Sequence, residues 1–327
     1  MYSLQVNKRK SNIELLRLLS MLMILNLHSF WGYRHGSGLL QAIDFFRECT
    51  SICAVDVFIL ISGYFSIKWK LKSFYNLVFQ IFFYSFSVYG LSILFGFVSF
   101  NKNDFFHCFK ALYSSWGFIT SYIIMYFASP CMNSFVERTS SRRLLIYILV
   151  IFFAENFVFY SRDVINFCLL YLLGRWLYKT NAIHQLANHP IKKYWFITFC
   201  IFTLTYSMFL FCNFKVEKIQ SLFVGLNYAA PLVILQAVFL FISFAKINLN
   251  SNFINWCSVS CLSIFLIHMH PAIKNIGYYA YTENLYDKPL CEHILILFAL
   301  MIVVFVGSII IDKVRIFFLI KYIPSCH

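Results

Sequence analysis

Long apolar stretches separated by short polar segments are the dominant pattern of this chain. About ten of them approach the length of roughly 17–25 residues that an α-helix needs to cross a bilayer. They cover residues 12–33, 52–67, 74–97, 111–133, 144–160, 164–178, 195–214, 222–244, 259–279 and 294–319. The pattern predicts an all-α fold, a polytopic bundle of transmembrane helices whose longest external loops are residues 34–51 and 279–293.

The basic residues between the stretches indicate the orientation. If the N-terminus is cytoplasmic, the loops on that side hold sixteen Lys and Arg residues and the opposite loops hold nine. Cytoplasmic loops carry the excess of positive charge in membrane proteins, so both termini are predicted to be cytoplasmic. These clusters also account for the net charge of +14, and they favour the lipid bilayer over nucleic acid as a partner.

The composition agrees with a membrane protein. The 327-residue chain is 61% hydrophobic and 12% charged, against the roughly 25% charged residues of a soluble domain. Its eleven cysteines are scattered, many of them inside apolar stretches, in a spacing that fits neither a disulfide framework nor a zinc site. We therefore expect residues 1–327 to form a single integral membrane domain with no metal and no fused soluble domain.

Arg17 and His28 are ionisable residues inside the first apolar stretch, where charge is costly. Eleven positions at about 100° each bring them to within roughly 20° of one helical face, some 16 Å apart along the axis. Arg17 at the cytoplasmic end suits the phosphates of an anionic donor, and the deeper His28 suits a general base. Two simpler interpretations stay open: Arg17 forms an ion pair with Glu14, and His28 is hydrogen-bonded to a neighbouring helix.

Asp56 begins the second stretch, and its role has two interpretations. It orients His28 and fixes its tautomer, or it favours the start of a helix, where the dipole attracts negative charge. Ser62 and Tyr64, on either side of Gly63 near the end of the same stretch, are candidates for substrate contact or structural support, with helix packing as the simpler role.

Three lysines, Lys68, Lys70 and Lys72, follow that stretch directly. They are predicted to anchor the chain at the cytoplasmic face, and they also offer a binding place for donor phosphates.

Four further residues are candidates for substrate contact or structural support. Glu155 and His268 are ionisable groups inside later stretches, and we expect them to approach the face that carries Arg17 and His28. Trp116 and Tyr122 lie near the start of the fourth stretch, where aromatic residues often mark the membrane interface.

Several of these residues also form recognisable motifs. The matching positions are residues 12–17 with His28, residues 56–65, Trp116 with Tyr122, Ser129, Pro130 and Asn133, and residues 263–268. In the same order they resemble the motifs of the acyltransferase 3 family, bacterial inner-membrane enzymes that O-acetylate surface glycans and related acceptors. The chain departs from the family where many members have an Arg-x-x-Arg pair, because it has lysines at 68, 70 and 72.

The resemblance implies a function. The donor is a cytoplasmic acyl-CoA, usually acetyl-CoA, and the acceptor is a hydroxyl of a surface polysaccharide or of its lipid-linked precursor. His28 is the base or a transient acyl carrier, while Arg17 and the three lysines hold the donor's phosphates. A transporter or flippase of a sugar or a lipid-linked glycan is the alternative function, although the six prolines follow no internal repeat of the kind that many transporters show.

Overall fold

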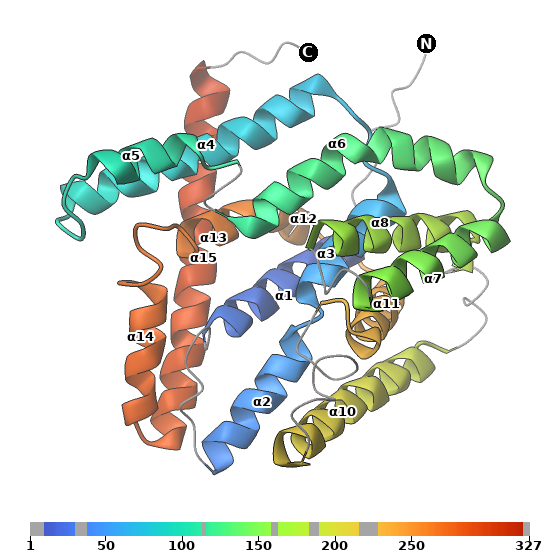
Figure 1. Ribbon diagram of the computed structural model, residues 1–327. Helices are drawn as coiled ribbons and strands as arrows, with labels where there is room; N and C mark the ends of the chain where they lie inside the picture. The colour runs from blue at the N-terminus through green and yellow to red at the C-terminus, as the bar shows by residue number, and fades with distance from the viewer. Residues whose placement is uncertain are drawn as a thin grey trace.

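The computed structural model describes residues 10–29, 38–112, 116–157, 163–182, 190–215 and 228–322, and this part of the chain is all-helical. The first half contains α1 (Ser11–His28), α2 (Leu39–Ser51), α3 (Ala54–Phe65), α4 (Leu71–Leu94), α5 (Lys102–Phe109), α6 (Gly117–Arg138) and α7 (Ser141–Phe157). The second half contains α8 (Asp163–Lys179), α10 (Ile191–Lys215), α11 (Pro231–Ala245), α12 (Asn252–Ser258), α13 (Cys261–His268), α14 (Tyr278–Asn284), a short 3₁₀ helix (Leu285–Asp287) and α15 (Leu290–Tyr322). The predicted all-α class is confirmed, with α1 and α3 in the middle of the arrangement (Figure 1).

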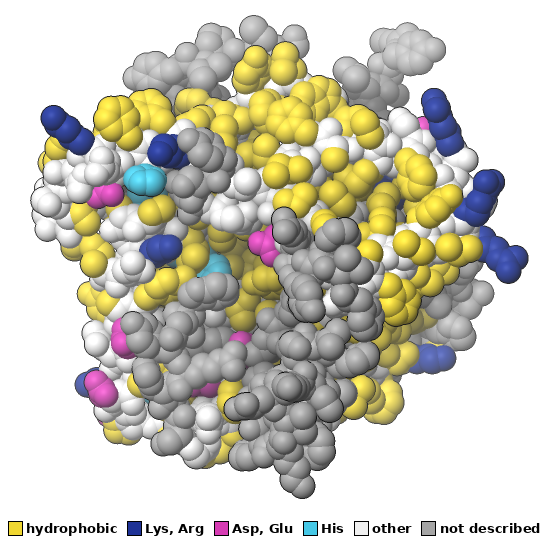
Figure 2. All heavy atoms as spheres, in the orientation of Figure 1, with side chains coloured by type: hydrophobic (Ala, Val, Ile, Leu, Met, Phe, Trp, Pro, Cys, Tyr) yellow, Lys and Arg dark blue, Asp and Glu magenta, His cyan; other side chains and the backbone are white. Residues whose placement is uncertain are grey.

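Two helices of the described part are long and apolar enough to cross a membrane by length and composition: α4, and residues Leu290–Phe318 of α15. Many of their large apolar side chains are exposed, including Leu94, Leu295 and Val303. Hydrophobic side chains also cover much of the described surface on the face drawn in Figure 2. Such a surface is stable in lipid and not in water, whereas the ten-span count and the orientation of the termini stay predictions.

The helix boundaries correct two of the predicted external loops and one predicted span. Residues 34–51 were expected to be a loop, but α2 occupies most of this segment, and α14 with the 3₁₀ helix occupies part of 279–293. The ninth stretch, 259–279, was expected to be one continuous helix, but α13 ends at His268 and a turn follows. Pro271 explains the turn, because proline has no N–H to donate to the preceding helical turn.

Helix α3 is the centre of the packing, and it contacts α1, α8 and α11. Its residues Ile59, Leu60 and Ile61 have no exposed surface. Glycines allow the close approach of α3 to α8: a Cβ atom built on Gly174 would lie 2.5 Å from the backbone oxygen of Leu60, and one on Gly63 would overlap the backbone of Tyr171. Small residues at a membrane helix interface permit this kind of backbone contact, so this pair of glycines fixes α3 beside α8.

Candidate functional site

A cavity of about 800 Å³ lies between α1, α3, α6, α13 and the turn after α13. Its volume falls within the range of roughly 300–1,000 Å³ that is usual for small-molecule sites. Polar and aromatic residues from these elements line it, among them Arg17, His28, Ser62, Trp116, Tyr122 and Lys274. The cavity therefore collects, from distant parts of the chain, five of the residues that the sequence singled out and one that it did not.

Arg17 and His28 both face this cavity, as their eleven-residue spacing predicts. Nη1 of Arg17 donates to the two carboxylate oxygens of Glu14 at 3.0 and 3.2 Å, so the predicted ion pair is present. The Arg17 side chain nevertheless keeps 31% of its surface exposed, which leaves the guanidinium accessible to an anion in the cavity. The ion pair and a phosphate-binding role are thus compatible.

Ser62 and Tyr122 lie at the Arg17 end of the cavity. The Ser62 side chain interacts with the Tyr122 phenol, and Arg17 acts on the same phenol electrostatically. The Ser62 hydroxyl donates to the carbonyl oxygen of Phe58 at 3.0 Å, one helical turn earlier. Its hydrogen is therefore already engaged within α3, and Ser62 offers a ligand only the lone pairs of its oxygen.

His28 ends α1 and pairs with His268, the last residue of α13. The Nδ1 atom of His28 lies 2.8 Å from Nε2 of His268, and Nδ1 of His268 lies 2.6 Å from the carbonyl oxygen of Ile264. Both imidazoles are buried, at 7% and 3% exposed. His268 was expected to approach the face that carries His28, and the structure places it in direct contact.

The chain of contacts defines the tautomers of the two histidines. A carbonyl oxygen only accepts, so Nδ1 of His268 carries its hydrogen and donates to Ile264. In an uncharged His268 the Nε2 atom is then an acceptor, and Nδ1 of His28 donates to it. The other ring nitrogen of His28, Nε2, is then the one without a hydrogen, which is the tautomer that a general base requires.

Asp56 forms no hydrogen bond to His28 in the described part of the chain. It lies in the first turn of α3, is completely buried, and has no hydrogen-bond partner for either carboxylate oxygen among the described residues. Its electrostatic neighbours include Glu155 and Asn166 rather than the histidines. The position in the first helical turn agrees with the second interpretation, stabilisation by the helix dipole.

Glu155 is likewise buried and away from the lining of the cavity. It lies in α7, and neither of its carboxylate oxygens has a hydrogen-bond partner in the described part of the chain. The structure thus places Glu155 outside the cavity lining, in a helix that packs mainly against α8, and its role as a site residue stays a prediction.

Tyr64 is also outside the cavity lining. Its ring packs against Phe65, Tyr178 and Phe241, with ring centroids 5.0–5.5 Å apart. These ring contacts agree with structural support, one of the two roles predicted for Tyr64.

The three lysines that follow α3 are exposed and do not line the cavity. A network of side chains nevertheless fixes the start of this segment. The Tyr171 hydroxyl accepts from the backbone N–H of Ile67 at 3.0 Å and donates to the Asn133 side chain at 2.9 Å, and Asn133 donates back to the Ile67 carbonyl at 3.0 Å. The backbone that leads to Lys68 is thus held in one position by α6 and α8.

Trp116 anchors the turn that follows α13 to the start of α6. Its indole Nε1 donates to the carbonyl oxygen of Met269 at 2.9 Å, and the side chain is 3% exposed. Trp116 is therefore a buried wall of the cavity rather than a residue of an interfacial belt.

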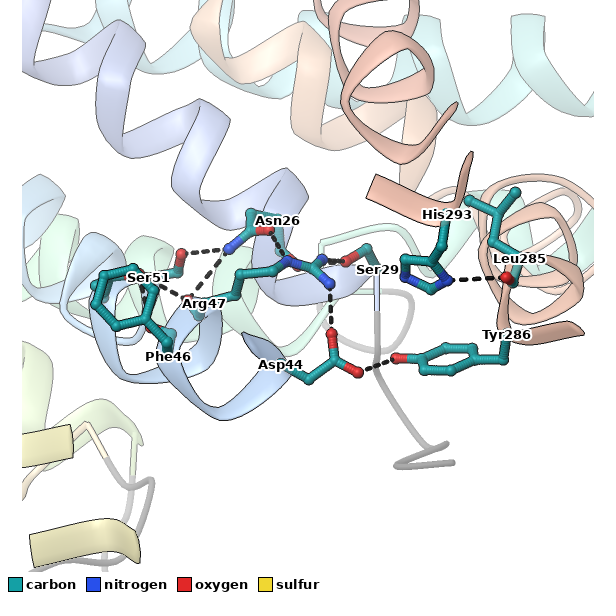
Figure 3. Close-up of polar contacts among 10 residues, drawn as sticks. Asn26, Ser29, Asp44, Phe46, Arg47, Ser51, Leu285, Tyr286 and His293 are labelled. Atoms are coloured by element: carbon teal, nitrogen blue, oxygen red, sulfur yellow. Dashed lines mark hydrogen bonds and ion pairs between the residues drawn. The ribbon is translucent and has the colours of Figure 1, made fainter. Parts of the chain in front are cut away.

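A second polar network holds the far end of α1 (Figure 3). Arg47 of α2 donates to Asn26 at 2.9 Å, to Asp44 at 2.6 Å and to the Ser29 hydroxyl, while the Tyr286 hydroxyl donates to Asp44 at 3.0 Å. Burial, and next the nearby Asp44 carboxylate, raise the pKa of Tyr286 well above its ordinary value, so the phenol stays a donor. This network fixes the turn that follows His28 and thereby the position of the imidazole.

Lys274 is the residue of the cavity that the sequence reasoning missed. It lies in the turn after α13, six residues beyond His268, and it acts electrostatically on His28. Lys274 lies near the end of an apolar stretch, and the sequence analysis counted it only as one of the nine basic residues of the external loops. The signal that could have found it is its spacing from His268, because a short turn returns the chain towards the end of its helix.

No group of three or more His, Cys, Asp or Glu side chains that could hold a metal ion occurs among the residues that the structure describes. The polar groups that line the cavity are the His28 imidazole, the Arg17 guanidinium, the Lys274 ammonium, the Asp163 carboxylate, the Asn275 amide and several hydroxyls, so two cations stand against one carboxylate. Such a set suits an anionic ligand and proton transfer.

Comparison with known proteins identifies the family. No curated protein matches the chain. No solved structure matches it either. A family model described as an acyltransferase domain matches residues 10–313, nearly the whole chain. The chain belongs to the acyltransferase 3 family and is a membrane acyltransferase.

Proposed function

We propose that this protein transfers an acyl group, acetyl in the first place, from cytoplasmic acyl-CoA to a hydroxyl of a cell-surface polysaccharide or of its lipid-linked precursor. The observation that carries the proposal is the cavity that both Arg17 and His28 line, in which the contacts of His28 with His268 and of His268 with Ile264 define the tautomer of His28. The family match supports acyl transfer in general, and the donor and acceptor are the proposed part.

His28 activates the acceptor. Its Nε2 accepts the proton of the acceptor hydroxyl as the oxygen adds to the thioester carbonyl carbon. The resulting tetrahedral intermediate collapses, the carbon–sulfur bond breaks, and the CoA thiolate leaves and takes up the proton from His28. The same unprotonated Nε2 could also attack the thioester carbon, so trapping of an acyl-histidine on the protein separates the two routes.

Arg17 holds a phosphate of the donor. Its guanidinium faces the cavity about 16 Å along α1 from His28, a separation that places a bound phosphate well away from the reacting thioester. The exposed Lys68, Lys70 and Lys72 attract the donor's remaining phosphates as point charges at the surface.

The proposal includes the location of the enzyme. We place it in the bacterial cytoplasmic membrane as a multi-pass protein of about ten spans, with both termini in the cytoplasm. The excess of basic residues in alternate loops supports this orientation, which puts Arg17 on the side where acyl-CoA is made.

Mass spectrometry of cell-surface glycans tests the proposal in cells. Glycans are compared from cells with the gene intact, with the gene deleted, and with the deletion complemented by His28→Ala. Loss of the acetyl mass in the deletion and in the His28→Ala cells is the expected result. Fully acetylated glycans with reduced surface export would instead favour the transporter or flippase and overturn the acyltransferase proposal.

A further inference from the structure

Acyl transfer at His28 requires a partner for negative charge that neither histidine supplies. When the acceptor oxygen adds to the thioester, the carbonyl oxygen becomes an oxyanion, and hydrogen-bond donors aimed at it are usually the largest single contribution to catalysis. Arg17 is a cation of the cavity, but it lies about 16 Å along α1 from His28 and is paired with Glu14. It cannot bind a donor phosphate and also reach the reacting carbonyl.

Several neutral donors of the cavity are already engaged, and Asn275, next to Lys274 in the chain, carries no charge to offset that of an oxyanion. The Trp116 indole donates to the Met269 carbonyl, and the Tyr279 hydroxyl contacts the Met269 sulfur at 3.2 Å. The Ser62 hydroxyl donates within α3, at the Arg17 end. None of these three engaged donors has a hydrogen to offer an oxyanion without breaking an existing bond.

Lys274 differs from them in three respects. Its side chain lines the cavity, it acts electrostatically on His28, and it forms no ion pair with a carboxylate in the described part of the chain. Its backbone is fixed, because its N–H donates to the His270 carbonyl at 2.9 Å, two residues from the histidine pair. The Lys274 backbone is therefore fixed close to the histidine pair, and its side chain lines the same cavity as His28.

We propose that Lys274 is a catalytic residue whose ammonium stabilises the oxyanion of the tetrahedral intermediate. This inference rests on the proposed acyl transfer and adds a residue to it. Lys274 donates a hydrogen bond and keeps its proton throughout. The negative charge forms on the carbonyl oxygen as the acceptor oxygen adds, and it returns to the departing CoA sulfur when the carbonyl re-forms.

The cation also acts on the histidine. Lys274 is one of the charges that act electrostatically on His28. Once the oxyanion has formed, its negative charge offsets Lys274, and the imidazolium produced by proton transfer is tolerated. One residue thus serves both the base and the intermediate.

Steady-state kinetics of the purified protein in lipid nanodiscs test this role. The assay follows CoA release from acetyl-CoA by mass spectrometry, with surface glycan extracted from the deletion strain as acceptor. Lys274→Met is expected to lower kcat by about 10²- to 10³-fold, the usual cost of one oxyanion donor, with little change in the KM for acetyl-CoA. Lys274→Arg, which keeps the cation, is expected to recover part of kcat.

Controls separate the outcomes. Lys288 is an exposed lysine that directly follows the 3₁₀ helix, and Lys288→Met is expected to behave as wild type. Lys274→Gln serves if Lys274→Met does not give monodisperse protein. An unchanged kcat, or a raised KM with unchanged kcat, in a folded Lys274 variant would overturn the oxyanion role. An inactive wild-type protein would instead overturn the proposed function, so the two failures are distinguishable.

Discussion

Replacing His268 with phenylalanine removes the acceptor of the His28 Nδ1 hydrogen while it keeps a ring of similar size. His268 is 3% exposed and its ring lies 5.7–6.0 Å, between centroids, from Phe265 and Tyr278. Phenylalanine fits among these aromatic neighbours, so the packing of α13 against α1 is expected to survive. The His28 imidazole then has no partner to fix its tautomer and rotation.

The expected loss follows from the hydrogen bond at 2.8 Å between the two imidazoles. A buried donor that loses its acceptor costs about 1–3 kcal/mol. Because each 1.36 kcal/mol changes a rate tenfold, this corresponds to a decrease in kcat of about 5- to 150-fold if the cost falls on the reactive form of His28. The KM for acetyl-CoA should stay near wild type, because the phosphates bind far from this pair.

The assay is the same measurement of CoA release in nanodiscs, with His268→Gln as the matched control. The glutamine carboxamide has an oxygen that can accept from His28 Nδ1, so this variant is expected to keep more of kcat than His268→Phe. Thermal unfolding in detergent verifies that both variants are folded. A folded His268→Phe variant with wild-type kcat, or with lower activity in the glutamine variant than in the phenylalanine variant, would refute the role assigned to the histidine pair.

Two further predictions concern the donor and the packing. Arg17→Met should raise the KM for acetyl-CoA by about 10-fold or more, because a charge-assisted hydrogen bond contributes roughly 1.5–3 kcal/mol. Glu14→Gln keeps the cation and should leave the KM near wild type, and a similar rise in both variants would show that only the ion pair matters. Gly174→Ala places a Cβ 2.5 Å from the Leu60 oxygen and should lower stability by about 1–3 kcal/mol, measured as a lower Tm in detergent. Gly90→Ala, where a Cβ meets nothing within 4 Å, is its control, and an equal loss of Tm in both would refute the close contact of α3 and α8.

The sequence predicted the helical class and the shared face of Arg17 and His28, because both depend on local periodicity. A helical repeat of 3.6 residues places residues eleven apart on one side whatever surrounds the helix. The break at residues 269–277 was visible in Pro271 but was outweighed by the apolar character of the whole stretch. Amphipathic α2 was missed because its buried Asp44 and Glu48 made the segment look like a polar loop.

The partners within the site could not be predicted, because they depend on which helices meet. The contact of His28 with His268 joins residues 240 positions apart, and nothing in either segment indicates the other. For the same reason the sequence left two interpretations of Asp56 open and did not indicate that its neighbours include Glu155 and Asn166. Lys274 had a clear local explanation as an external charge, and only the turn after α13 places it in the cavity.

The central claim is that His28 is the base of an acyl transfer from acyl-CoA. The most direct test incubates the purified protein with isotopically labelled acetyl-CoA and surface glycan from the deletion strain, and then measures label in the glycan. The account predicts labelled glycan with the wild-type protein and none above background with folded His28→Ala. Wild-type transfer that persists at full rate in His28→Ala would contradict it.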